Sequence, residues 1–168
     1  MKIGILGGSF DPAHKGHLAI SKEARKRFKL EKIIWAITKK NPLKAESKTP
    51  ISKKIKDCKK IIGLNSFIKI KFYENIIKSN KTIDLINYIK KNKNIEIFFL
   101  MGADNLISFH KWHKSELISK KCNIIVFDRH GYKKNSLKSK TFKRLNNKTL
   151  TFVEFKKVNI SSSQLRKI

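Results

Sequence analysis

The feature that most constrains the fold is a regular alternation of short apolar runs with longer stretches of helical periodicity. Six runs rich in β-branched and aromatic residues are typical of strands: 2–6, 32–37, 67–72, 95–101, 122–127 and 150–155. Most are apolar throughout, which is typical of strands buried on both faces of a parallel sheet. Single helical stretches between them predict right-handed crossovers. We therefore expect an α/β protein with one doubly wound, mostly parallel sheet, in a single domain spanning 1–168.

Helices are predicted where the apolar residues recur with a helical period. The spacing predicts helices over 17–28, 51–62 and 82–91, and the second follows Thr49 and Pro50, a capping residue and then a proline. The lysine-rich stretch 132–148 has few apolar residues and is predicted to be an irregular surface segment.

The chemically unusual stretches come directly after predicted strands. In a doubly wound sheet, ligands bind beyond the carboxyl ends of the strands, where the winding reverses. We therefore expect one rim of the sheet to hold "GGSFDPAHKGH" (7–17), "TKKNPLK" (38–44), "GADN" (102–105), "DRHGY" (128–132) and "NISSSQLR" (159–166).

Charge and cysteine content narrow the class of protein. The formal net charge is +28, but the cations are scattered and nearly all are lysine, which favours a solvated surface and an AT-rich coding sequence over a nucleic-acid partner. The charge still attracts small phosphorylated anions. No run is long and apolar enough for a membrane span, no secretory leader is evident, and two distant cysteines suggest no disulfide framework. A cytoplasmic protein is expected.

Glycines and histidines dominate the stretch after the first strand. Gly7 and Gly8 permit close approach of a ligand to the backbone, but the spacing matches neither the Walker nor the dinucleotide glycine pattern. His14 and His17 share one face of a first helical turn, where free amides favour an anion. They could equally form a capping turn or a metal pair. A zinc site with His110 and His113 is disfavoured, since no carboxylate or thiolate partner is evident.

Three features further along the chain are candidate ligand contacts, and two of them also have a purely structural interpretation. The serines of "ISSSQLR", followed by Arg166, are either a helix cap or a second anion site. Asp104 follows a strand and a glycine, where a carboxylate can accept hydrogen bonds from ribose hydroxyls. Trp112 is either a core aromatic residue or a stacking platform for a flat ring.

Together, "GSFDPAHKGHL" and "ISSSQLR" resemble the HxGH and ISSS-x-x-R motifs of the nucleotidyltransferase superfamily, in the right order. "NPLK", "MGADNLISFHKW" and "DRHGY" extend the resemblance to the bacterial nicotinate-nucleotide adenylyltransferases over nearly the whole chain. The resemblance implies a Rossmann-like nucleotidyltransferase fold. It also implies transfer of AMP from ATP to nicotinate mononucleotide, which gives deamido-NAD and pyrophosphate.

The resemblance also assigns roles residue by residue. His14 and His17 are implied to be the catalytic histidines beside the ATP phosphates, where they cancel charge and donate hydrogen bonds. Backbone contacts to ATP are implied for Gly8, Ser9 and Phe10. Asp104 is implied to hold the ribose, and the triphosphate is implied to be bound by Ser161, Ser162 and Arg166. Lys44, Thr82 and Trp112 are implied to bind the mononucleotide. Mg²⁺ is implied as a cofactor held mainly by the ATP phosphates, with no metal ligand assigned to the protein.

Two departures and some alternatives accompany this resemblance. His130 stands where the family usually has proline, and the sequence ends two residues after Arg166, where the family usually continues into a further helix. A looser triphosphate end of the site is therefore expected. The acceptor could instead be nicotinamide mononucleotide or pantetheine phosphate, and a basic nucleic-acid-binding protein is the non-enzymatic alternative. A homo-oligomer is compatible with the sequence.

Overall fold

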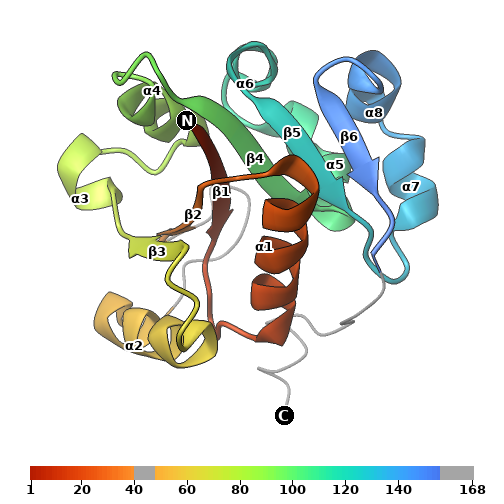
Figure 1. Ribbon diagram of the computed structural model, residues 1–168. Helices are drawn as coiled ribbons and strands as arrows, with labels where there is room; N and C mark the ends of the chain where they lie inside the picture. The colour runs from red at the N-terminus through yellow and green to blue at the C-terminus, as the bar shows by residue number, and fades with distance from the viewer. Residues whose placement is uncertain (40–47, 156–168) are drawn as a thin grey trace.

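Six strands form one all-parallel sheet in the computed structural model, which describes residues 1–39 and 48–155. They are β1 (Lys2–Gly8), β2 (Lys32–Ile37), β3 (Ile68–Lys71), β4 (Glu96–Gly102), β5 (Asn123–Phe127) and β6 (Leu150–Val153). Their order across the sheet is β3-β2-β1-β4-β5-β6 (Figure 1), so the winding reverses between β1 and β4. All six predicted strands are confirmed.

Helices connect the strands and cover both faces of the sheet. They are α1 (Lys15–Phe28), α2 (Ile51–Ile62), α3 (Glu74–Ile77), α4 (Thr82–Ile89), α5 (Ala103–Ser108), the 3₁₀ helix η1 (Phe109–Lys111), α6 (Ser115–Lys121), α7 (Lys133–Leu137) and α8 (Lys140–Leu145). Helices α1, α2 and α4 confirm the three predicted helices. No helix among the described residues is long and apolar enough to cross a bilayer.

The prediction of an irregular segment over 132–148 is wrong, because α7 and α8 lie within it. Each helix has only one or two turns, which leaves little periodicity in the sequence. They are fixed by tertiary contacts and by a cap: Ser136 and Thr141 are buried, and the Ser139 hydroxyl accepts a hydrogen bond from the amide of Phe142 at 3.1 Å.

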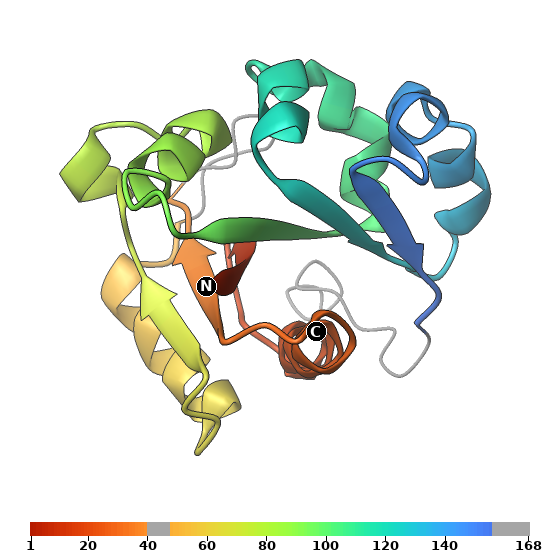
Figure 2. The ribbon, with the colours of Figure 1, turned by 45° about the horizontal axis from the view of Figure 1, so that its top comes forward.

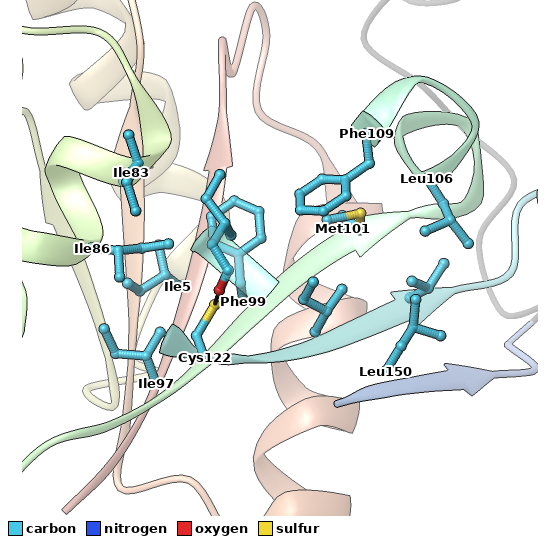
Figure 3. Packing of buried hydrophobic residues seen from close by; sticks show 14 of the residues in the cluster. Ile5, Ile83, Ile86, Ile97, Phe99, Met101, Leu106, Phe109, Cys122 and Leu150 are labelled. Atoms are coloured by element: carbon cyan, nitrogen blue, oxygen red, sulfur yellow. Dashed lines mark hydrogen bonds between the residues drawn. The ribbon is translucent and has the colours of Figure 1, made fainter. Parts of the chain in front are cut away.

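Two hydrophobic clusters fill the spaces on the two faces of the sheet. One joins β-strand residues to α4, α5 and α6, and includes Ile83, Phe99 and Leu106 (Figure 3). The other joins the opposite face to α1 and α2 (Figure 2), and includes Ala24 and Trp35. The two cysteines are free, buried thiols in different clusters. The central strands are thus buried on both sides, which explains their continuous apolar sequences.

Gly4, in the middle of β1, shows how closely the first crossover packs. A β-carbon at this position would lie 2.9 Å from Leu30 Cδ1 and 3.1 Å from Ile33 Cγ1. Leu30 and Ile33 belong to the segment that returns from α1 into β2. The absence of a side chain at Gly4 lets that segment lie directly against β1, and this fixes the position of the turn at the other end of the strand.

Candidate active site

The turn between β1 and α1 is anchored in the core by an aromatic side chain. Phe10 has a left-handed φ of 49°, and its ring is 2% exposed. The ring stacks on Trp35 of β2, with centroids 5.1 Å apart, and also contacts the His17 ring at 4.6 Å. The glycines before Phe10 therefore remain at the carboxyl end of β1, while the aromatic ring fixes where α1 begins.

His14 and His17 form a reciprocal cap at the start of α1. The Nδ1 atom of His14 accepts a hydrogen bond from the amide of Gly16 at 3.0 Å, and Nδ1 of His17 accepts one from the amide of His14 at 3.1 Å. The two rings lie 4.0 Å apart. Because each Nδ1 is an acceptor, we infer that the proton of each neutral imidazole is on Nε2, which leaves Nε2–H free to donate to a ligand.

Both imidazoles are held in the neutral form. Burial, followed by the charge of Arg129, lowers the pKa of His14 from 6.5 to about 4. Burial also holds the pKa of His17 well below 6.5, and the neighbouring His14 and Arg129 act in the same direction. Protonation would moreover remove the Nδ1 acceptor on which each cap depends. In the unliganded chain the pair consists of neutral donors, which differs from the expectation that they cancel charge as cations.

A hydrogen-bonded chain from the sheet holds the backbone of His17. The hydroxyl of Ser21, one turn further along α1, donates to the carbonyl oxygen of His17 at 2.8 Å. The same hydroxyl accepts a hydrogen bond from the indole Nε1–H of the fully buried Trp35 at 2.8 Å. Strand β2 therefore positions the helix turn that carries the two imidazoles.

An acidic and a basic residue meet at the ends of the next two strands. Asp104 lies in the first turn of α5, directly after β4, and Arg129 follows β5. Arg129 Nη1 lies 2.9 Å from Asp104 Oδ2. Because Arg129 also lowers the pKa of both histidines, its positive charge acts from the end of β5 on the start of α1. The predicted rim thus brings together His14, His17 and Asp104.

The second oxygen of the Asp104 carboxylate has no hydrogen-bond partner. Within the described residues, the Oδ1 atom is both buried and unpaired. A β-carbon at residue 102 would lie 2.6 Å from this oxygen, so Gly102 provides the space that it occupies. An unpaired buried oxygen costs free energy, so Arg129 alone does not satisfy the Asp104 carboxylate.

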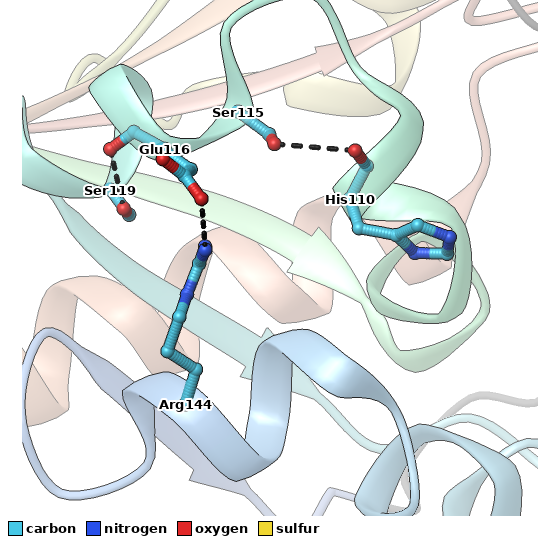
Figure 4. Close-up of polar contacts among 5 residues, drawn as sticks. All are labelled: His110, Ser115, Glu116, Ser119 and Arg144. Atoms are coloured by element: carbon cyan, nitrogen blue, oxygen red, sulfur yellow. Dashed lines mark hydrogen bonds and ion pairs between the residues drawn. The ribbon is translucent and has the colours of Figure 1, made fainter.

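The described residues contain no group of three or more His, Cys, Asp or Glu side chains that could hold a metal ion. His110 and His113 are both exposed, and His110 contributes its carbonyl oxygen, which accepts from the Ser115 hydroxyl at 3.4 Å. Figure 4 shows the His110 ring directed away from the contact between Glu116 and Arg144. The two HxxH pairs do not form a joint metal site.

Comparison with known proteins decides the family. A family model described as cytidylyltransferase-like matches residues 5–168. A protein of Pelagibacter ubique (strain HTCC1062), named as a probable nicotinate-nucleotide adenylyltransferase, is 66% identical over 167 residues, which is 99% of this chain and 93% of that protein. This chain belongs to the nicotinate-nucleotide adenylyltransferase family, within the cytidylyltransferase-like proteins.

More distant members of the family agree. A probable nicotinate-nucleotide adenylyltransferase of Bradyrhizobium sp. (strain ORS 278) is 36% identical over 130 residues, or 77% of this chain and 68% of that protein. The solved structure of Plasmodium falciparum nicotinic acid mononucleotide adenylyltransferase complexed with APC has a TM-score of 0.80 at 24% identity, covering 99% of this chain and 82% of that chain. This likeness confirms the predicted Rossmann-like nucleotidyltransferase fold.

Two of the residues implied for mononucleotide binding, Thr82 and Trp112, are among the described residues. Thr82 is the first residue of α4 and is partly buried. Trp112, directly after η1, is partly buried, and its ring meets Phe99 edge-on at 5.9 Å and Phe109 at 5.2 Å. The indole is therefore packed against the core on one side while retaining some exposure. Lys44, Ser161, Ser162 and Arg166 lie outside the described residues.

Two residues at this site were not assigned a role from the sequence. Arg129 lies in "DRHGY", which follows β5, so its place after a strand was a usable signal. Lys54, on α2, is 1% exposed, and its ammonium lies at the β1–α1 turn. It is one lysine among many, and nothing in its sequence surroundings distinguishes it.

Proposed function

We propose that this chain transfers AMP from ATP to nicotinate mononucleotide, with deamido-NAD and pyrophosphate as products. The observation that carries the proposal is the 66% identity to the Pelagibacter ubique protein over nearly the whole chain. The geometry supports it, since paired imidazole donors, a carboxylate with an unpaired oxygen and a guanidinium all lie at the switch point of the sheet.

The reaction needs no general base. A nucleotide monophosphate has its second pKa near ~6, so it is largely dianionic at neutral pH. One of its oxygens attacks the α-phosphorus of ATP, the bond from that phosphorus to the bridging oxygen breaks, and pyrophosphate leaves with the electron pair. The main obstacle is the repulsion between two polyanions, about 4 kcal/mol for each pair of unit charges at ~4 Å in an effective dielectric of ~20.

The side chains at the rim reduce this obstacle in different ways. His14 and His17 donate from Nε2–H to phosphate oxygens, and this donation strengthens as negative charge grows in the transition state. Arg129 supplies a fixed positive charge, because a guanidinium stays protonated. Asp104 is proposed to accept a hydrogen bond from a ribose hydroxyl. Lys44, Ser161, Ser162 and Arg166 are proposed to complete the anion contacts, and Thr82 and Trp112 to bind the mononucleotide.

Mg²⁺ fits this site as part of the ATP complex. Magnesium in such enzymes is usually bound by one or two carboxylates together with substrate phosphates. When bound, it neutralises phosphate charge.

A pyrophosphate-release assay tests the function. With ATP and MgCl₂, we expect release to require nicotinate mononucleotide and to be at least tenfold slower when nicotinamide mononucleotide or pantetheine phosphate replaces it. Release without any acceptor would indicate ATP hydrolysis instead. Equal or faster turnover with either alternative acceptor would reassign the substrate, and no release with any of the three would refute the proposal.

A further inference from the structure

Lys54 is a fully buried cation at the edge of the candidate site. It is the fourth residue of α2 and is 1% exposed. Its Nζ atom donates to the hydroxyl oxygen of Ser9 and to the carbonyl oxygen of Thr38, both at 3.3 Å. One ammonium group therefore joins α2, the turn after β1 and the end of β2.

Packing alone does not explain a charge at this position. Removing an ammonium group from water is costly unless hydrogen bonds compensate the lost hydration. A methionine would fill much of the same space beside the apolar residues of α2, but it could not donate to Ser9 or Thr38. The ammonium therefore contributes hydrogen bonds to the turn after β1 and to the end of β2.

The contacts of Lys54 include Thr38, a residue that is itself hydrogen-bonded to the end of β1. The amide of Thr38 donates to the carbonyl oxygen of Gly8 at 2.9 Å, and the Thr38 hydroxyl donates to the carboxylate of Glu74 on α3. Thr38 is thus held by its amide and its side chain, and it offers its carbonyl to Lys54. The hydrogen bond to the Thr38 carbonyl therefore fixes the position of the Lys54 ammonium, which makes its other hydrogen bond to the hydroxyl of Ser9.

The direction of the Ser9 hydroxyl follows from this contact. An ammonium group can only donate, so the Ser9 oxygen must be the acceptor. The hydroxyl proton of Ser9 is then directed away from Lys54 and can donate elsewhere. Ser9 lies between Gly8 and Phe10 in the turn that leads to the imidazoles, so a phosphate oxygen bound at this rim is a suitable acceptor.

We propose that Lys54 is a positioning residue that fixes the Ser9 side chain so that its hydroxyl donates to a phosphate of the bound nucleotide. The inference rests on the proposed function for the identity of that nucleotide. Lys54 itself stays beneath the turn and acts through Ser9.

Calorimetric titration with ATP in the presence of MgCl₂, combined with thermal unfolding, tests the role of Lys54. Lys54→Met is expected to unfold cooperatively as the wild type does, while the Kd for ATP rises at least fivefold. Lys56→Met removes the same charge from an exposed position of α2, and it is expected to bind ATP as the wild type does. Wild-type affinity in Lys54→Met, or an equal loss in Lys56→Met, would overturn the proposal.

A double-mutant cycle with Ser9→Ala tests whether Lys54 acts through Ser9. Ser9→Ala alone should weaken ATP binding by a similar factor, and the double variant should bind no more weakly than either single one. Independent, multiplying effects would overturn the proposal. If Lys54→Met does not fold, the Ser9→Ala variant still tests the proposal. Wild-type ATP affinity in Ser9→Ala would show that the Ser9 hydroxyl does not donate to a phosphate of the nucleotide.

These outcomes are separable from those of the proposed function. A wild-type chain that binds ATP but releases no pyrophosphate with any acceptor refutes the transferase, while the affinity cycle still decides the role of Lys54. A wild-type chain that does not bind ATP refutes both.

Discussion

In each imidazole of the histidine pair, one ring nitrogen stabilises the fold and the other is available to a ligand. Nδ1 caps the backbone of α1, and Nε2–H remains for a phosphate oxygen. Two free helix-end amides are thereby satisfied by the same side chains that are expected to meet the ligand. An aliphatic residue at either position would lose the cap as well as the donor, whereas asparagine at His14 would retain a cap acceptor.

The lowered pKa of His14 predicts a pH dependence of stability. The pKa falls from 6.5 in the unfolded chain to about 4 in the folded chain, so protonation favours the unfolded state. The stabilisation is fully present above pH 6.5 and is lost as the pH falls from 6.5 towards 4. Urea unfolding at pH 7.0, 5.5 and 4.5 should show a drop in unfolding free energy that His14→Asn reduces by about 2 kcal/mol, allowing for partial screening.

His113→Asn is the matched control for this measurement, because His113 is exposed and lies far along the chain from the cap. It should leave the pH dependence unchanged. A His14→Asn variant that loses as much stability as the wild type between pH 7.0 and 4.5 would show that His14 is not held neutral by the fold.

Among the elements, the buried strands could be predicted from the sequence, whereas the short helices that tertiary contacts stabilise could not. Strands such as β1 and β4 are buried on both sides, so their apolar runs are continuous and easily recognised. Helices α7 and α8 are too short to show a period, and contacts and a single serine cap hold them.

The same contrast holds at the site. The position of His14 and His17 at the start of α1 could be predicted, because an unusual motif connects a predicted strand to a predicted helix there. The position of Lys54 could not, since it depends on how α2 packs against the turn after β1. The neutral state of the histidines also depends on burial and on Arg129, which is distant in the sequence.

The close contact between β1 and the segment after α1 predicts a specific packing defect. Gly4→Ala would place a β-carbon 2.9 Å from Leu30 Cδ1, so the strand or that segment must shift. We expect a loss of about 1–3 kcal/mol in unfolding free energy, as for other overpacked cores. Gly7→Ala on the same strand meets only an ordinary contact of 3.7 Å and should cost much less. Equal unfolding free energies for the two variants would contradict this packing.

For the whole molecule, the order of the strands explains why residues distant in the sequence can serve one reaction. The carboxyl ends of β1, β4 and β5 are adjacent because the winding reverses between β1 and β4. This brings the histidine pair, Asp104 and Arg129 to one rim, while the two hydrophobic clusters hold the sheet from both sides. We propose that this rim transfers an adenylyl group, with His17 stabilising the transition state.

The most direct test follows the label from ATP that carries ³²P at the α-phosphorus, in the presence of nicotinate mononucleotide and MgCl₂. In the wild type, the label should enter deamido-NAD. In His17→Ala, we expect the rate of labelling to fall at least 100-fold, since one transition-state donor is worth a factor of about 10²–10³, while the Kd for ATP changes by less than about threefold. Label that enters AMP instead of the dinucleotide, or an unchanged rate in His17→Ala, would contradict the account.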